Sequence, residues 1–183
     1  MNFVTRALIE SVNWAALRAD SGNGGGIPRA LNDLWEASSE DEARRAYWQI
    51  DNEAVVQGQL YESAVPTLQA LLSMASVIPS GPRRRAVAEL IQQIVFGQPH
   101  SLENAEENVD IVARCSHLAM GAVWLFYGWL TDDDSEVREL ALLILQKVED
   151  DDQRKFMIFS ACRNKDSSPG VQAALAEIDR GLH

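Results

Sequence analysis

The sequence has few cysteines and few basic residues, and both shortages limit what the protein does. Two cysteines in 183 residues, Cys115 and Cys162, are too few for a disulfide framework. Sixteen lysines and arginines stand against 27 aspartates and glutamates, which gives a formal net charge of −11 at pH 7. A surface of this charge repels phosphate backbones and anionic lipids, so we expect neither nucleic-acid nor membrane binding. It would attract a basic partner, although many proteins are acidic only for solubility.

The sequence also lacks a long uninterrupted apolar segment. The N-terminal stretch contains Arg6 and Glu10, and no other segment is long enough to cross a bilayer. We therefore expect a protein of the reducing cytoplasm. No stretch shows sustained alternation of apolar and polar residues, so the predicted fold class is all-α.

Motifs of catalytic and metal sites are missing as well. The three histidines, His100, His117 and His183, are far apart and form no HxxxH or HExxH spacing. Cys115 and His117 are two residues apart, which points them away from each other on a helix. The glycine-rich run 21–26 has no Gly-Lys-Ser/Thr ending, so we interpret it as a flexible link and not as a phosphate loop. We expect no enzyme activity, no metal and no cofactor.

Residues 118–148 give the strongest structural signal. An apolar helical segment, 118–130, is followed by the acidic corner Thr131-Asp132-Asp133-Asp134 and by a second helical segment. In the second segment apolar residues recur with the period of a helix, at Val137, Leu140, Ala141, Ile144, Leu145 and Val148. The corner is too short to do more than reverse the chain, so we predict an antiparallel helix hairpin.

This hairpin recurs along the chain. Residues 63–72 align with 121–130 at an offset of 58, and residues 84–94 align with 138–148 at an offset of 54. The offset changes in the loop 79–82, where Pro-Ser-Gly-Pro replaces the acidic corner, and weaker copies start at Ser39 and Ser168. A recurring helix pair indicates a repeat architecture in which each unit buries its apolar face against the next.

The repeated segments carry a family resemblance. The segment 134–141, DSEVRELA, resembles the start of a HEAT-type repeat, and 64–71, AVPTLQAL, resembles the partner helix of such a unit. The resemblance covers most of the chain from about Ser39 onward, with Gln172 where an arginine is usual and Tyr47-Trp48 where small residues are expected. It implies a single domain, residues 1–183, built as a short α-solenoid of HEAT-like antiparallel helix pairs.

The other elements follow from local signals. Residues 1–18 are predicted to form an N-terminal capping helix with Val4, Leu8, Val12 and Ala15 on one side. Further helices are expected from Pro28 to about Glu36, from Ser39 with its capping-box partner Glu42 to about Val56, from about Ser63 to Val77, from Arg83 to Phe96, and from the acidic lead Glu103, Glu106, Glu107 and Asp110 to Leu130. Two more helices should follow the second acidic corner, 149–152. The first holds Phe156, Met157, Phe159 and Cys162, and the last holds Val171, Ala174, Leu175 and Ile178 and stops at Gly181. The cluster Arg83-Arg84-Arg85 opens a helix, where positive charge is mildly unfavourable. We expect these arginines to lie in water or to pair with nearby carboxylates, and the alternative is that they grip an acidic group of a partner.

Two acidic corners and an aromatic stripe are the candidate partner-binding residues. The corners contribute Asp132, Asp133, Asp134, Glu136, Asp150, Asp151 and Asp152, and the stripe Met120, Trp124 and Tyr127 recurs at i, i+4 and i+7. Carboxylates before a helix cap its free N–H groups, and in stacked units they would also form one negative strip that steers a basic protein. Aromatic residues ringed by charge are typical of interface centres, although a helix covered on both sides would give the same stripe.

The resemblance also suggests a function. The chain is similar to small bacterial HEAT-like proteins, among which are cytosolic immunity proteins of secreted polymorphic toxins. It implies a protein-binding module that binds a basic toxin domain and covers its active site. A general scaffold or adaptor is one alternative. An enzyme is another, because HEAT-like folds resemble those of alkylpurine DNA glycosylases and bilin lyases, but a glycosylase needs a basic concave surface that a charge of −11 argues against.

Overall fold

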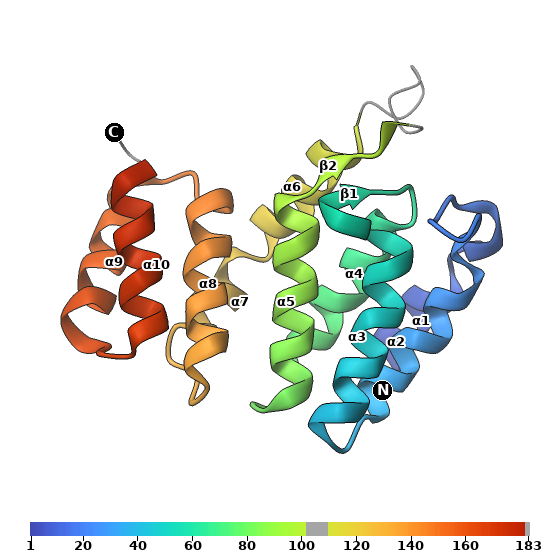
Figure 1. The fold of residues 1–183 in the computed structure, drawn as a ribbon, viewed down its shortest axis with the longest axis horizontal. Helices are drawn as coiled ribbons and strands as arrows, with labels where there is room; N and C mark the ends of the chain where they lie inside the picture. The colour runs from blue at the N-terminus through green and yellow to red at the C-terminus, as the bar shows by residue number, and fades with distance from the viewer. Residues whose placement is uncertain (102–109, 182–183) are drawn as a thin grey trace.

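The computed structural model describes residues 1–101 and 110–181 and is all-α, as predicted (Figure 1). The helices are α1 (Phe3–Glu10), α2 (Ile27–Glu36), α3 (Glu40–Ala54), α4 (Ala64–Ala75), α5 (Pro82–Phe96), α6 (Ile111–Gly121), α7 (Val123–Trp129), α8 (Ser135–Val148), α9 (Asp152–Lys165) and α10 (Pro169–Gly181). Short 3-10 turns lie at η1 (Trp14–Ala16), η2 (Gly24–Gly26) and η3 (Val56–Gly58). Two-residue strands, β1 (Gln59–Leu60) and β2 (Gln98–Pro99), pair in parallel.

The helices lie in consecutive contact along the long axis of the molecule. In one row α2 contacts α3, α3 contacts α5, α5 contacts α8 and α8 contacts α10 (Figure 1). Behind this row α1 contacts α4 and α4 contacts α6, while α7 packs on α8 and α9 contacts α8 and α10. A continuous apolar core runs between them and includes the fully buried side chains of Leu31, Ile50, Leu68, Leu90, Phe126 and Ile144.

The predicted helix start at Ser39 is confirmed, but one hydrogen bond of the predicted capping box has a different partner. The Ser39 side chain accepts a hydrogen bond from the backbone N–H of Glu42, so α3 begins where the sequence predicts. The Glu42 carboxylate accepts from the backbone N–H and the hydroxyl of Ser38, both at 2.7 Å. The reciprocal half of the capping box is therefore made one residue earlier than in the standard pattern.

The predicted helix over residues 1–18 is wrong in its length and in its buried side. Helix α1 ends at Glu10, and Asn13 at φ −82° and ψ 75° turns the chain into η1. Thr5 and Ile9 are buried, whereas Val4 and Leu8 are exposed. Apolar side chains occur on two neighbouring stripes of this segment, so periodicity could not decide which stripe α4 covers.

The glycine-rich run is also not a flexible link. Residues Gly24–Gly26 form η2, which continues directly into α2, and the Asn23 side chain accepts from the backbone N–H of Gly25 at 3.0 Å. Gly24 is buried, and a Cβ atom there would lie 3.2 Å from the Trp14 carbonyl oxygen and 3.3 Å from Ser63 Cβ. Glycine at this position permits close approach of two chain segments rather than mobility.

The predicted continuous helix up to Leu130 is broken. The axes of α6 and α7 differ by 60°, and the break lies at Ala122, directly after Gly121, a weak helix former. The bend brings α7 onto α8 and buries Phe126 and Trp129. The predicted acidic lead Glu103, Glu106 and Glu107 lies outside the described residues, and Asp110 directly precedes α6.

The bent pair α6 and α7 is also the apolar part of the described chain that bears on membrane spans. Within residues 1–101 and 110–181, no single helix is both long and apolar enough to cross a bilayer. Helices α6 and α7 reach the required length and composition only when they are counted together across their bend.

Candidate functional site

The arginine cluster that opens α5 joins this helix to the acidic corner before α8. Arg84 donates from Nη1 to the Asp132 carboxylate and from Nε to the Ile78 carbonyl oxygen at 3.1 Å. Arg85 donates from Nε and Nη2 to the Asp134 carboxylate at 2.9 and 2.7 Å. The basic cluster therefore connects the start of α5 to the corner before α8, which accounts for its position at a helix start.

The Asp132 side chain is buried and fully engaged. Burial raises the pKa of its carboxyl group, but hydrogen bonds from the Ser80 hydroxyl at 2.5 Å, from the Asp134 N–H at 2.9 Å and from Arg84 outweigh it, so the pKa is lowered overall. The carboxylate is thus ionised and held inside the fold. It does not face solvent as a predicted partner-binding residue would.

The same connection recurs between α8 and the corner before α10. Arg138 donates from Nη1 to the Asp132 carbonyl oxygen at 2.7 Å and from Nε to the Asp166 carboxylate at 2.5 Å. Arg84 and Arg138 each bond a carbonyl oxygen six residues earlier and a carboxylate in the following corner. Gln172, at the position where an arginine was expected, bonds the Asp166 carbonyl oxygen, again six residues earlier. We call this series the arginine ladder.

The predicted acidic strip is only partly free. At the first corner Asp132 pairs with Arg84 of the arginine ladder, and Asp134 pairs with the neighbouring Arg85. Glu136 lies 3.3 Å from Arg85. Asp133 is exposed, and no ion-pair partner for its carboxylate occurs among the described residues. This corner therefore presents little unpaired negative charge.

The second corner keeps more of its charge. Asp151 is the N-cap of α9 and accepts from the Arg154 N–H at 2.9 Å. The Asp152 side chain is 97% exposed and lies 3.5 Å from Lys155, and Asp150 is exposed with no ion-pair partner in the described part of the chain. Capping and exposed charge thus coexist in one turn, as the sequence predicted.

Glu149, a residue that sequence reasoning missed, organises this corner. Its buried carboxylate accepts from Arg154 at 2.9 and 2.7 Å, from the Tyr127 hydroxyl and from the Asp151 N–H at 2.8 Å. Hydrogen bonding from Arg154, opposed by burial, lowers the pKa of Glu149 to about 2. Burial and the bond to Glu149 raise the pKa of Tyr127 to about 12, so this phenol stays protonated at neutral pH.

Two of the three predicted aromatic-stripe residues meet this corner. The rings of Trp124 and Tyr127 lie 5.3 Å apart, and the Arg154 guanidinium carbon lies 5.5 Å from the Trp124 ring centroid. Trp124 is nevertheless 69% exposed. Met120 is exposed on α6 before the bend and does not line the same surface, so the predicted i, i+4, i+7 stripe is interrupted at Ala122.

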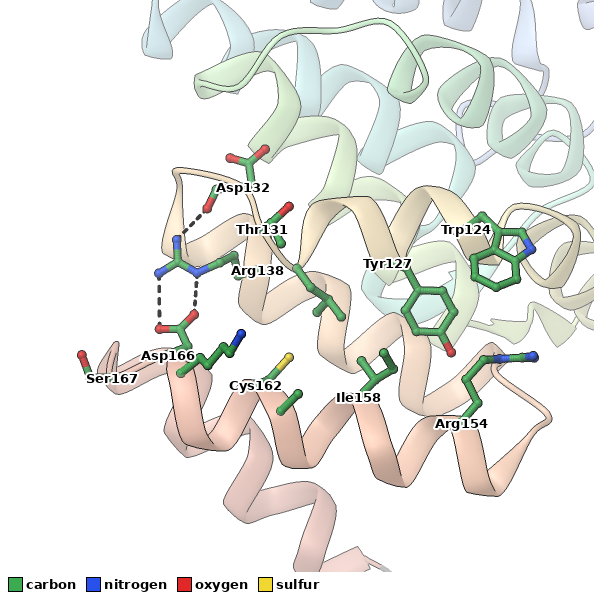
Figure 2. A pocket seen from close by; sticks show the side chains of 13 residues that line it. Trp124, Tyr127, Thr131, Asp132, Arg138, Arg154, Ile158, Cys162, Asp166 and Ser167 are labelled. Atoms are coloured by element: carbon green, nitrogen blue, oxygen red, sulfur yellow. Dashed lines mark hydrogen bonds and ion pairs between the residues drawn. The ribbon is translucent and has the colours of Figure 1, made fainter.

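Helices α7 and α9 enclose a groove of about 700 Å³, with Arg138 of α8 at one end (Figure 2). In Figure 2, Trp124 and Tyr127 point from α7 toward Ile158 and Arg154 of α9, and dashed lines join Arg138 to Asp132 and Asp166. The lining is Trp124, Tyr127, Leu130, Thr131, Asp132, Arg138, Arg154, Ile158, Ala161, Cys162, Lys165, Asp166 and Ser167. We call it the α7–α9 groove.

The α9 wall of the groove was not foreseen from the sequence. Arg154, Ile158, Ala161, Cys162 and Lys165 fall at i, i+4, i+7, i+8 and i+11, which places them on one side of a helix. Of the large apolar side chains expected on this helix, Phe156 and Met157 are exposed and only Phe159 is buried. The sequence signal that could have predicted this wall is the helical spacing of Ile158, Ala161 and Cys162 between the cations Arg154 and Lys165.

Histidine, cysteine and carboxylate side chains are scattered in the described part of the chain. No group of three or more histidine, cysteine, aspartate or glutamate side chains within them is arranged to hold a metal ion. Cys115 is buried, which raises its pKa to about 12 and keeps the thiol protonated at neutral pH.

The chain matches no protein-family model, no curated protein and no solved structure. Neither a family nor a partner can therefore be taken from a relative. The groove, the exposed Trp124 and the exposed carboxylates Asp150 and Asp152 are the features from which a function can be argued.

Proposed function

We propose that this protein is a binding module that recognises a basic protein through α7, the corner 149–152 and α9. The carrying observation is Trp124, which is 69% exposed at the mouth of an apolar groove and lies next to the corner that holds Asp150 and Asp152. Large exposed aromatic side chains dominate binding energy when a partner buries them. The exposed carboxylates and the net charge of −11 favour a partner of opposite charge and speed its approach.

We propose that the framework is a short HEAT-like α-solenoid. The consecutive contacts from α2 through α10 and the arginine ladder, which repeats with one geometry at Arg84 and Arg138, support this architecture. In such a stack each unit contacts mainly its neighbours, so the outer helices remain free to contact another protein. The groove then lies between the last two units.

Within this class we propose a cytosolic immunity protein that neutralises a basic toxin domain by covering its active site. The resemblance to small HEAT-like immunity proteins and the acidic surface support this choice. A scaffold or adaptor would use the same surface, but its partner would be harmless to the cell. The two are therefore separated by what the partner does when it is expressed alone.

The test starts from the full chain as bait in native cell extract, with mass spectrometry to identify what it retains. The purified partner is then measured against wild type and the variant Trp124→Ala/Asp150→Lys/Asp152→Lys. A matched control, Trp48→Ala/Glu10→Lys/Glu177→Lys, removes another exposed tryptophan and changes the charge equally at exposed positions elsewhere.

We expect the groove variant to weaken binding by at least about 100-fold, which corresponds to about 2.7 kcal/mol, and the control to stay within about 3-fold of wild type. The partner should be basic, toxic when expressed alone and harmless when the wild-type chain is co-expressed. An acidic partner, or equal loss in both variants, would rule out the proposed face. A basic partner that is not toxic would support the alternative function, a scaffold or adaptor.

A further inference from the structure

Exposed charges of opposite sign lie at the two ends of the α7–α9 groove. Asp150 and Asp152 do not line the groove but lie where α9 begins, and Lys165 of the lining lies where α9 ends. The other charged side chains of the lining are paired, Arg154 with Glu149, Arg138 with Asp166 and Asp132 with Arg84. Lys165 is exposed, and within residues 1–101 and 110–181 no carboxylate pairs with its ammonium group. Helix α9 has 14 residues, so at 1.5 Å per residue the two ends are about 20 Å apart.

Apolar and small side chains occupy the middle of the groove. Tyr127 of α7 and Leu130, directly after α7, lie across it from Ile158, Ala161 and Cys162 of α9. In the neighbouring units α4 contacts α6 directly, whereas α9 makes its main contacts with α8 and α10 and leaves the groove beside α7. Ala161 and the half-buried Cys162 allow a backbone to approach closely at the centre.

The walls of the groove restrict the kind of backbone that fits. Both walls are helices whose N–H and C=O groups are already bonded internally, and the paired strands β1 and β2 belong to other residues, 59–60 and 98–99. An extended segment buried here would leave its own N–H and C=O groups without partners, which is costly. A helix bonds its own backbone and can bury an apolar stripe in such a groove.

From this geometry we propose that the groove binds an amphipathic helix of the partner protein, about 13 residues long and antiparallel to α9. Its apolar stripe packs between Tyr127 and Ile158, acidic side chains in its first turn face Lys165, and lysine or arginine in its last turn faces Asp150 and Asp152. This charge order also suits the dipole of the bound helix, because acids stabilise its N-terminus and bases its C-terminus. The inference rests on the proposed function and specifies the element that is recognised.

The experiment selects ligands without knowledge of the native partner. A library of random 14-residue peptides is panned on the full chain, with counter-selection on Ala161→Trp, which fills the groove from an exposed position. We expect enriched sequences with Asp or Glu in the first turn, apolar residues at i, i+3, i+4 and i+7, and Lys or Arg in the last turn. Bound peptide should become helical by circular dichroism and should slow alkylation of Cys162.

A charge swap fixes the orientation. For a synthesised winning peptide, Lys165→Glu should raise Kd by at least about 10-fold, or about 1.4 kcal/mol. Replacement of the acids in the first turn of the peptide by lysine should restore binding to this variant and weaken binding to wild type. Because Lys165 is exposed, the substitution leaves the fold intact, which the thermal midpoint verifies.

Two failures can be told apart. The helix-in-groove inference would be refuted if no peptide survived the counter-selection, if the surviving peptides showed no order of charge, or if they ignored Lys165→Glu, while the native partner still depended on Trp124. If peptides bind with the expected polarity but the native partner ignores Trp124, Asp150 and Asp152, the proposed function fails and the helix-binding groove stands.

Discussion

Arg138 Nε lies 2.5 Å from a carboxylate oxygen of Asp166, and the two side chains are only 19% and 16% exposed. The same guanidinium group holds the Asp132 carbonyl oxygen, so one side chain fixes the corner before α8 to the corner before α10. Because Arg138 and Asp166 also line the α7–α9 groove, the connection that stabilises this end of the molecule sets the position of the groove wall.

Replacing Arg138 by alanine should destabilise the protein by about 2–3 kcal/mol, since it leaves the Asp166 carboxylate partly buried without its partner. The measurement is urea denaturation followed by circular dichroism. Arg29→Ala serves as the control, because Arg29 pairs with Asp33 at 3.8 Å on the surface and should cost less than about 0.5 kcal/mol. Equal effects of the two substitutions would contradict the role of the arginine ladder.

Acid should weaken the two corner ion pairs only at low pH. Hydrogen bonds from Arg138 and Arg154 lower the pKa of Asp166 and of Glu149 to about 2, below the ordinary 3.8 and 4.5. A lowered folded-state pKa contributes stability that is complete above the unfolded pKa and is lost as pH falls toward about 2. After allowance for solvent screening we expect about 1–2 kcal/mol from each group.

The pH prediction is checked by thermal midpoints of wild type and Asp166→Asn between pH 7 and pH 2. The difference in stability should be constant from pH 7 to about pH 5 and should shrink between about pH 4 and pH 2. A difference that persists unchanged at pH 2 would show that the Asp166 charge contributes nothing.

Substitutions of two neighbouring aromatic residues of α7, Phe126 and Trp124, should affect stability and partner binding differently. Phe126 is fully buried, so Phe126→Ala should cost about 3–5 kcal/mol through lost burial and a cavity. Trp124 is 69% exposed, so Trp124→Ala should change the free energy of unfolding by less than about 1 kcal/mol while it abolishes most partner binding. A strongly destabilised Trp124→Ala would mean that the tryptophan is a packing residue.

The acidic corners should respond differently to substitution. Asp132→Asn should destabilise by about 2–4 kcal/mol, because it leaves the charge of the partly buried Arg84 unpaired and weakens the bonds from Ser80 and the Asp134 N–H. Asp150→Lys with Asp152→Lys should cost less than about 1 kcal/mol, since both side chains are exposed.

The rate of association with the partner tests the role of the second corner. The Asp150→Lys/Asp152→Lys variant should slow association by about 10-fold and flatten its dependence on salt, because these charges steer the encounter. Stopped-flow measurements between 50 and 500 mM salt test it. An association rate equal to that of wild type at low salt would remove the second corner from the binding surface.

The two thiols should react at different rates. Cys162 is half-buried on the groove wall, and burial and Asp166 raise its pKa moderately, whereas Cys115 is buried with a pKa of about 12. In the folded protein at pH 8 we expect one thiol, Cys162, to be alkylated slowly, and Cys115 only after unfolding in urea. Peptide mapping by mass spectrometry identifies the modified residue, and early labelling of Cys115 would contradict its burial.

Much of the local structure could be read from the sequence, because it depends on neighbours in the chain. Ser39 and Asp134 accept from backbone N–H groups at helix starts, Pro28 lies in the first turn of α2, and the apolar period of 137–148 buries the matching side of α8. The equivalence of Arg84 and Arg138 was also visible as an offset of 54, and their hydrogen bonds repeat.

The predictions failed where contacts between residues far apart in the sequence decide the local structure. Which stripe of α1 is buried depends on α4, and the glycine run orders because Trp14 and Ser63 close around Gly24. The bend at Ala122 follows from the packing of Phe126 and Trp129, and it separates Met120 from Trp124.

The sequence by itself determined most of the helices, the caps at Ser39 and Asp134, the two acidic corners and the surplus of negative charge, since these depend on residue type and on spacing within one turn. Only the tertiary structure decided which carboxylates are neutralised, because Asp132 and Asp134 meet arginines 48 and 49 residues away. The tertiary structure also decided that a groove opens between α7 and α9. The position of α7 depends on the bend that separates it from α6, and the packing of α7 near α9 depends on the side chains of both helices.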